Sequence, residues 1–414
     1  MMSFKYLNGE ERSMAMRSLS SARLERMHNV LADYVERGVV PGLVALVNRK
    51  GETHVETLGA MALGGSDPMR RDTIFRIASV TKPITAAATM ILVEECKLRL
   101  DEPVDGLLPE LANRQVLKRL DGPLDDTESA NRSITVRDLL TFTAGYGLVM
   151  ADFPIQHAID ELGLVGFGPP DVANPLTPDE WIERLGTLPL MHQPGEKWMY
   201  NTGSYILGVL IARASRQPLE AFLRERIFEP LGMQDTGFSV PSGKLDRFAT
   251  SYWTDFETGR LDLFDAPEDS QWASPPAFPD GGGGLVSTAD DLGAFGQMML
   301  DKGVYDGRRI LSRPSVELMT VEHLTPEQKA ATDNLSMFLG NHGWGFGVAV
   351  VHERDDIAST PGKYGWSGGL GTNWAVDPAE QMITILLTQA SFTSPSGPMI
   401  IEDFGTLAYQ AIDD

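Results

Sequence analysis

Ser79 and Lys82, in the stretch Ser79-Val80-Thr81-Lys82, have the residue types and spacing that most directly suggest chemistry. A run of helix formers follows, so the pair is predicted to lie on the first turn of a helix, where side chains three positions apart project from one face. The start of a helix also offers unpaired backbone N–H groups and the positive end of its dipole. A serine in that setting can become nucleophilic without a histidine. No other lysine of the chain has a serine three residues before it, although about one or two such patterns arise by chance at this length.

Ser367 is the rival nucleophile, because Gly365-Trp366-Ser367-Gly368-Gly369 matches the G-x-S-x-G elbow of α/β-hydrolases. That fold needs a histidine after the serine in chain order, and all seven histidines come before Ser367. The sequence that follows is typical of a strand pair, not of a strand-to-helix turn. We therefore interpret this segment as a tight, glycine-rich strand.

Tyr200 is the candidate for a second proton-handling group, which the chemistry needs because a leaving alkoxide must be protonated. It lies in Pro194-Gly195-Glu196-Lys197-Trp198-Met199-Tyr200-Asn201-Thr202-Gly203, just before a predicted helix. No metal or organic cofactor is expected, because the histidines are scattered and neither His-Glu-x-x-His nor a Walker A pattern occurs. Residues 281–284, all glycine, are predicted to form a tight turn packed against other backbone. The single cysteine, Cys96, is interpreted as a packing residue of a helix.

Composition limits the partners. Lys+Arg is 35 and Asp+Glu is 57 in the 414-residue chain, giving a net charge of −22. Such an acidic surface repels nucleic acid and anionic lipid, so neither is expected as a partner. Because the N-terminal region has no apolar signal-peptide core and no stretch approaches eighteen apolar residues, we expect a cytoplasmic protein. The oligomeric state stays open.

The expected strands cluster at the two ends of the chain and the helices in its middle. Residues 40–59 are typical of a β-hairpin, residues 343–388 of several strands, and residues 398–412 of a final helix. The pattern predicts an α+β fold in which N- and C-terminal segments build an antiparallel sheet flanked by helices. We expect one lobe from residues 1–78 and 285–414, a helical and irregular lobe from 79–284, and the active site between them. Residues 148–193, rich in proline and glycine, are predicted to form a lid or pocket wall.

Five motifs in a fixed order support a family resemblance. They are Ser79-x-x-Lys82, Leu139-Leu140-Thr141-Phe142-Thr143-Ala144-Gly145, the segment from Pro194 to Tyr200, the run from Gly282 to Leu292, and Trp366-Ser367-Gly368. Over residues 24–410 this order resembles the serine β-lactamase-like superfamily, the class C β-lactamase and penicillin-binding-protein group. Within that group the chain looks most like the family VIII carboxylesterases.

The resemblance implies roles for individual residues. Ser79 would be the acylated nucleophile, Lys82 its neighbour in proton transfer, and Tyr200 the general base and acid. The backbone N–H groups of Ser79 and Gly369 would form the oxyanion hole. The segment Trp366-Ser367-Gly368 would occupy the strand where β-lactamases have Lys-Thr-Gly. The aromatic residues expected to form pocket walls are Tyr146, Trp344, Phe346 and Trp366.

Two departures from the family pattern bear on the substrate. Thr202 stands where relatives often have the asparagine of Tyr-x-Asn, and Asn201, one position earlier, would point elsewhere. Trp366 replaces a lysine that would bind the carboxylate of a β-lactam or a D-alanyl peptide, and it offers instead an apolar face and one N–H donor. We therefore expect a serine hydrolase for small to medium uncharged carboxylic esters. A β-lactamase or D-peptidase, an acyltransferase, and a catalytically silent scaffold remain as alternatives.

Overall fold

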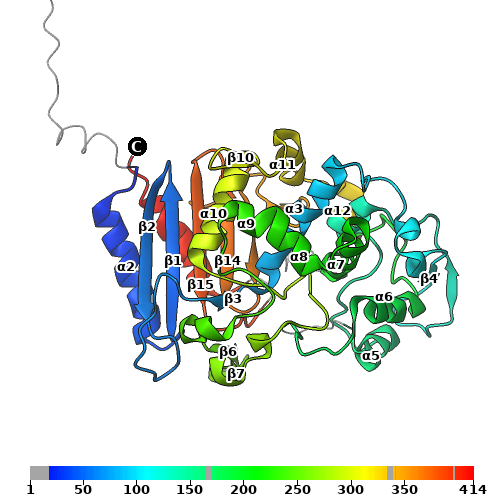
Figure 1. Ribbon diagram of the computed structural model, residues 1–414, viewed down its shortest axis with the longest axis horizontal. Helices are drawn as coiled ribbons and strands as arrows, with labels where there is room; N and C mark the ends of the chain where they lie inside the picture. The colour runs from blue at the N-terminus through cyan, green and yellow to red at the C-terminus, as the bar shows by residue number, and fades with distance from the viewer. Residues whose placement is uncertain (1–17, 165–169, 333–338, 341, 395–396) are drawn as a thin grey trace, which may run out of the picture.

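The two ends of the chain meet in one seven-stranded antiparallel sheet (Figure 1). The computed structural model describes residues 18–164, 170–332, 339–340, 342–394 and 397–414. The strand order is β11-β12-β13-β14-β15-β1-β2, and β1 pairs with β15, so the N-terminal hairpin extends a sheet of C-terminal strands. The strands are β1 (Gly42–Arg49), β2 (Glu52–Gly59), β11 (Gly343–Trp344), β12 (Ala349–Val350), β13 (Tyr364–Gly368), β14 (Thr372–Asp377) and β15 (Met382–Thr388). The predicted α+β fold, with its antiparallel sheet from both termini, is confirmed.

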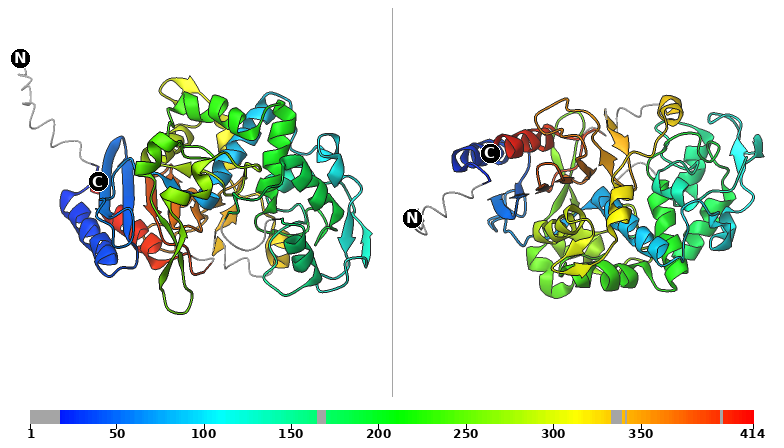
Figure 2. Two further views of the ribbon diagram at one scale, coloured as in Figure 1. Left: turned by 60° about the horizontal axis from the view of Figure 1, so that its bottom comes forward. Right: turned by 90° about the horizontal axis from the view of Figure 1, so that it is seen from above.

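Helices cover both faces of this sheet. α2 (Ser21–Glu36) and α14 (Met399–Gln410) lie side by side on one face, as the view from above shows (Figure 2). α10 (Ala289–Leu300) packs on the other face, against β1, β14 and β15. α3 (Thr81–Glu94) belongs to the large hydrophobic core on this side of the sheet. Because side chains alternate along a strand, β1 contributes to both cores and nearly all of its residues are buried.

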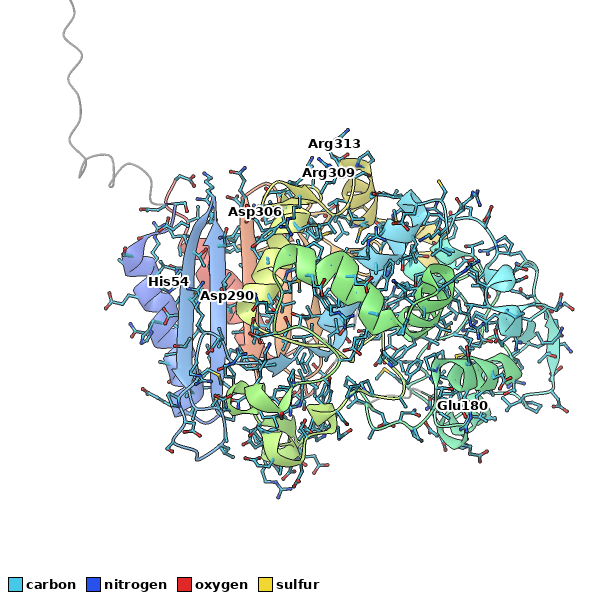
Figure 3. All side chains as sticks on the ribbon, in the orientation of Figure 1. His54, Glu180, Asp290, Asp306, Arg309 and Arg313 are labelled. Atoms are coloured by element: carbon cyan, nitrogen blue, oxygen red, sulfur yellow. The ribbon has the colours of Figure 1, made fainter. Side chains whose placement is uncertain are left out.

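The middle of the chain is mostly helical and lies beside α3. Two of its helices, α4 and α6, begin at side-chain caps. At the start of α6 the Thr177 hydroxyl accepts from the backbone N–H of Glu180, and the Glu180 carboxylate, labelled in Figure 3, accepts from the backbone N–H of Thr177. The elements are α4 (Val136–Leu140), α5 (Pro154–Glu161), α6 (Pro178–Thr187), α7 (Thr202–Ser215), α8 (Leu219–Leu223), a π-helical turn (Arg224–Phe228) and α9 (Glu229–Leu231). The segment expected to be irregular between 148 and 193 therefore contains two helices. Its residues 165–169 lie outside the described part.

Short two-stranded sheets and two small helices complete the fold. β3 (Phe75–Arg76) pairs with β8 (Val286–Ser287), and this pairing joins the segment before Ser79 to the segment before α10. The other elements are β4 (Gln115–Leu117), β5 (Thr127–Ser129), β6 (Ser251–Thr254), β7 (Leu261–Asp265), β9 (Val304–Tyr305), β10 (Arg308–Arg309), α11 (Arg313–Met319) and α12 (Pro326–Ala331). In the described residues, no helix is both long enough and apolar enough to cross a bilayer.

The interpretation of Cys96 as a helix packing residue is wrong. α3 ends at Glu94, and Cys96 follows it in the left-handed region at φ 56°, with its thiol exposed to solvent. The chain turns away from the core directly after α3, so the thiol side chain leaves the buried face.

Candidate active site

Ser79 lies in a 3-10 turn, Ala78–Val80, that leads directly into α3. The residue before it, Ala78, has φ 45°, a left-handed conformation that non-glycine residues rarely adopt and that often occurs at functional sites. Strands β13 and β14 both pack against this turn, and the hydroxyl of Thr372, the first residue of β14, donates to the carbonyl of Ile77 at 2.9 Å. A Cβ atom on Gly368 would lie 2.2 Å from that same carbonyl oxygen. Glycine at position 368 therefore allows the sheet to approach the turn that carries Ser79.

The segment leading to Ser79 is fixed by a buried ion pair. The guanidinium of Arg76, on β3, contacts the carboxylate of Asp265 and donates to the carbonyl of Ala249 at 2.6 Å. Burial lowers the pKa of Arg76 to about 10 even beside this carboxylate. Breaking one partner of such a pair would leave a buried charge unpaired, so this contact holds β3 and the β6–β7 hairpin together.

Ser79, Lys82 and Tyr200 are brought together around one oxygen atom. Lys82 Nζ lies 2.8 Å from Ser79 Oγ, and the Tyr200 hydroxyl lies 2.9 Å from the same atom. Lys82 Nζ is also 4.7 Å from the centre of the Tyr200 ring. An amine and a phenol, both of which can exchange protons, thus lie within hydrogen-bond reach of a single serine hydroxyl, a geometry that general base catalysis of a nucleophilic attack requires.

Lys82 is buried and held against the glycine run. Its ammonium donates to the carbonyl of Gly282 at 2.6 Å, and one helical turn later the hydroxyl of Thr85 donates to the carbonyl of Gly281 at 2.7 Å. A Cβ atom on Gly281 would lie 2.7 Å from the carbonyl oxygen of Ser204, so this position has no room for a side chain. The predicted tight glycine turn packed on other backbone is confirmed, and its carbonyls position α3.

Asp280, a buried carboxyl next to this turn, was missed by sequence reasoning. Its Oδ1 accepts a hydrogen bond from the backbone N–H of Gly282 at 2.6 Å. The carbonyl of that same glycine accepts the hydrogen bond from Lys82. Burial raises the pKa of Asp280 to about 6, although backbone N–H groups and the charge of Lys82 oppose that rise. An acidic residue directly before four glycines was the only signal in the sequence.

Aromatic side chains hold Tyr200 and Trp366 in place. Trp366 Nε1 donates a hydrogen bond of 2.9 Å to the hydroxyl of Tyr200. Trp198 stacks on the Tyr200 ring at 5.7 Å, and Phe142 meets it edge-on at 5.8 Å. Trp344 packs edge-on against Trp366 at 4.8 Å. This cluster fixes the orientation of the tyrosine hydroxyl that faces Ser79.

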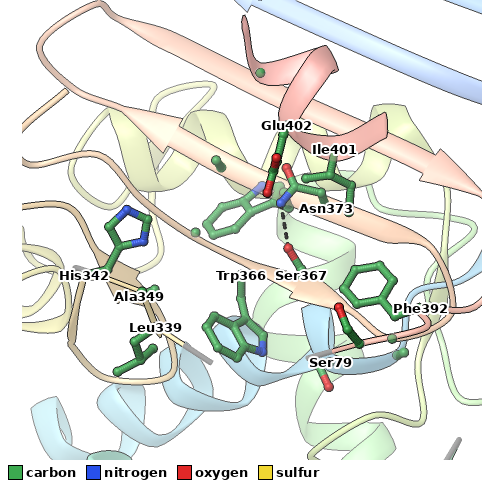
Figure 4. A pocket seen from close by; sticks show the side chains of 18 of the residues that line it. Ser79, Leu339, His342, Ala349, Trp366, Ser367, Asn373, Phe392, Ile401 and Glu402 are labelled. Carbon is green, nitrogen blue, oxygen red and sulfur yellow. Dashed lines mark hydrogen bonds between the residues drawn. The ribbon is translucent and has the colours of Figure 1, made fainter. Parts of the chain in front are cut away.

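A cavity of about 1020 Å³ opens at Ser79. Its lining includes Ser79, Tyr200, Trp366 and Gly369, so the residues expected at the nucleophile, the general base and the oxyanion hole share one space. Figure 4 shows Ser79 and Trp366 in this cavity. Ser367 also lines it, but its hydroxyl accepts from Asn373 Nδ2 at 2.8 Å on the neighbouring strand. The cavity wall near Ser79 includes Leu148, Met150 and Pro170, from the segment predicted to form a lid or wall.

Three residues expected as pocket walls lie elsewhere. Tyr146 is buried, with its hydroxyl 3.3 Å from the carbonyl of Leu188, and lines a separate small crevice. Phe346 is buried and stacks on His323 at 4.2 Å. Trp344 is fully buried behind Trp366. Of these expected aromatic walls, Trp366 faces the cavity, because the others belong to the cores on either side of it.

Asn201, and not Thr202, lines the cavity next to Tyr200. Asn201 lines the cavity beside Tyr200 and is 8% exposed, whereas Thr202 begins α7 and borders the small crevice. The expectation that Asn201 would point elsewhere is wrong. The reason lies in the helix start, since Asn201 is the non-helical cap of α7, at φ −140° and ψ 8°, and only from Thr202 onward do side chains follow helical spacing.

Comparison with known proteins agrees with this site and fold. The family model described as Beta-lactamase matches residues 27–401. Protein Rv1367c of Mycobacterium tuberculosis is 40% identical over 374 residues, which are 87% of this chain and 88% of that protein. Esterase EstB of Burkholderia gladioli is 31% identical over 407 residues, 93% and 95% of the two chains.

The fold is also similar to that of a solved structure. EstCE1, described as a hydrolase with promiscuous acyltransferase activity, superposes with a TM-score of 0.74 at 25% identity, covering 94% of this chain and 98% of that one. The family model spans most of the sequence, and the aligned relatives span most of their own lengths. This chain belongs to the β-lactamase family, in the serine β-lactamase-like superfamily that also includes esterases.

Proposed function

We propose that the protein is a serine esterase that cleaves uncharged carboxylic esters through an acyl-enzyme on Ser79. The observation that carries this proposal is the placement of Ser79 Oγ 2.8 Å from Lys82 Nζ and 2.9 Å from the Tyr200 hydroxyl, at the mouth of a large cavity. The relative EstB is an esterase by name, and its similarity over nearly the whole chain supports the same reaction class.

The reaction has two halves. Ser79 Oγ attacks the ester carbonyl carbon while its proton passes to the Tyr200–Lys82 pair, and the backbone N–H groups of Ser79 and Gly369 stabilise the negative oxygen. The carbon–oxygen bond to the alcohol breaks, and the alcohol leaves with the proton returned through Tyr200. Water then attacks the acyl-enzyme, gives a proton to the same pair, and releases the acid and free Ser79.

Trp366 directs this proposal toward esters and away from β-lactams. Its indole N–H is engaged with Tyr200, and its ring gives the cavity an uncharged wall next to Ser79. A carboxylate on the substrate would find no ammonium at this position of the strand. Hydrolysis of short-chain p-nitrophenyl esters and of nitrocefin by wild type and Ser79→Ala tests the proposal. We expect ester cleavage that depends on Ser79, and nitrocefin cleaved with comparable efficiency would contradict the substrate class.

Acyl transfer to an alcohol is the second candidate. It is favoured by the likeness to EstCE1, a hydrolase described with promiscuous acyltransferase activity, and by a cavity of about 1020 Å³ that has room for an acceptor beside the acyl-enzyme. Both reactions share the acyl-enzyme, so only the second half differs. Adding acceptor alcohols during ester cleavage and measuring new ester product against free acid separates the two.

A further inference from the structure

The cavity continues past Ser79 along the sheet to the first turn of α14. Ser367 of β13 and Asn373 of β14 stand opposite each other in the strand pairing, and both line it. Ile401 and Glu402 of α14 line the same space, and the Glu402 side chain points toward Asn373 (Figure 4). We call the part of the cavity bounded by Ser367, Asn373, Ile401 and Glu402 the distal arm.

The distal arm offers hydrogen-bond acceptor oxygens on the side chains of Asn373 and Glu402. Asn373 uses its amide N–H on the hydroxyl of Ser367 at 2.8 Å, which leaves its carbonyl oxygen for another partner. Glu402 makes no hydrogen bond or ion pair to any other described residue of the chain. It lies in the first turn of α14.

Further carboxylates add negative charge around the distal arm. Asp355, Asp356 and Asp403 also line the cavity. Asp355 accepts from the hydroxyl of Ser359, and Asp403 accepts from the Tyr34 hydroxyl at 2.6 Å. Asp356 accepts from the backbone N–H of Ala358. These contacts orient the three aspartates, whereas the Glu402 side chain points toward Asn373 (Figure 4).

The basic groups nearby do not balance this charge. The ammonium of Lys363 donates to the carbonyl of Ala358 at 2.8 Å and lies 4.8 Å from the Tyr409 ring centre, so it is turned into the protein. Burial lowers the pKa of Lys363 and that of His342, which disfavours the charged form of each side chain. The distal arm thus combines oxygen acceptors with net negative charge.

We propose that the distal arm binds a cationic group on the ester substrate, with Glu402 as its counter-ion and the carbonyl oxygen of Asn373 as a second contact. This deepens the proposed esterase function and rests on it. A quaternary or protonated amine fits such a site, whereas a carboxylate would be repelled. An ion pair in a cavity open to water changes the specificity constant by a modest factor, roughly five- to tenfold.

Two matched pairs of esters test the charge alone. Butyrylcholine and 3,3-dimethylbutyl butyrate differ by a quaternary nitrogen in place of a carbon on the alcohol side. The p-nitrophenyl esters of 4-trimethylammoniobutyrate and 5,5-dimethylhexanoate differ in the same way on the acyl side. We expect kcat/KM to favour the cationic member of at least one pair by roughly five- to tenfold, and salt to weaken the preference.

Variants assign the preference to Glu402. Glu402→Gln should remove the preference by lowering kcat/KM for the cationic ester, and Glu402→Lys should reverse the preference. Glu183→Gln, on the exposed face of α6, is the control that makes the same charge change away from the cavity. Equal rates within both pairs, or a preference that survives in Glu402→Gln, would overturn the inference and leave the esterase function standing. If none of the four esters is cleaved, both this inference and the proposed esterase function would be overturned.

Discussion

Trp366 Nε1 donates a hydrogen bond of 2.9 Å to the hydroxyl of Tyr200, and that same hydroxyl lies 2.9 Å from Ser79 Oγ. The indole of tryptophan is uncharged and has a single N–H donor. It therefore orients the tyrosine oxygen by a hydrogen bond and does not transfer its proton. A lysine at position 366 would present a cation to the substrate. Trp366 instead donates its hydrogen bond to Tyr200, the proposed general base. Trp366, the residue from which we expect uncharged substrates, therefore also orients the hydroxyl of Tyr200, the proposed proton-transfer group.

Replacing Trp366 by Phe should lower kcat/KM for a neutral ester about tenfold. The change keeps an aromatic wall and removes the N–H donor to Tyr200, and a hydrogen bond of this kind contributes about 1 to 1.5 kcal/mol. Steady-state kinetics on a p-nitrophenyl ester measure the effect. Trp253→Phe, at another part of the cavity wall, is the control and should stay within about twofold. Unchanged kinetics in Trp366→Phe would show that the bond has no role in turnover.

Tyr200→Phe should lower kcat at least about a hundredfold and leave the fold intact. Phenylalanine keeps the ring contacts with Trp198 and Phe142 but cannot exchange a proton with Ser79. Rapid mixing with an activated ester should show no burst of p-nitrophenol, and thermal unfolding should match the wild type. Activity above about a tenth of wild type would remove Tyr200 from the proton-transfer pathway.

Asp280→Asn should change the pH dependence of stability. The pKa of Asp280 is about 6 in the fold against 3.8 for the free side chain, so the folded state binds this proton more tightly than the unfolded state does. The stabilisation from that proton is complete below about pH 4 and is lost as pH rises through 6, at a cost of about 3 kcal/mol.

Urea unfolding at pH 4.5 and pH 7.5 measures this effect. The asparagine variant keeps an oxygen acceptor for the N–H of Gly282 and carries no ionisable group. Its free energy of unfolding, relative to wild type, should therefore rise between the two pH values. A constant difference across that range would mean that the Asp280 carboxyl is not held in a buried, desolvated state.

Gly281→Ala should lower the free energy of unfolding by about 1 to 3 kcal/mol, because the added methyl group would lie 2.7 Å from the carbonyl oxygen of Ser204. The turn that binds Lys82 would have to shift, so esterase activity should fall as well. Gly243→Ala is the matched control, since a Cβ atom there meets no atom within 4 Å. Equal stability of the two variants would contradict the close packing of the glycine turn.

Local patterns in the sequence predicted much of the fold. The hairpin of β1 and β2, the strands within residues 343–388 and the final helix follow from period-two and helical spacing with turn residues between them. Ser79, Lys82 and Tyr200 could be singled out because each lies in a short motif and the motifs come in a fixed order.

Residues that meet only through tertiary packing could not be predicted. Asn373 and Glu402 belong to no motif, and their proximity depends on the register of β13 with β14 and on where α14 begins. Tyr146, Trp344 and Phe346 are aromatic residues of the kind that often line ligand pockets. Whether such side chains face a cavity or a core is decided by the packing of neighbouring elements, which periodicity does not reveal.

Identification of the acylated residue tests the central claim most directly. The protein is mixed briefly with an activated p-nitrophenyl ester, quenched in acid and digested, and the modified peptide is sequenced by mass spectrometry. The account predicts one acyl group per chain on Ser79, absent from Ser79→Ala and accumulating in variants slow to react with water. Acylation at Ser367, or at any residue in Ser79→Ala at the wild-type rate, would contradict it.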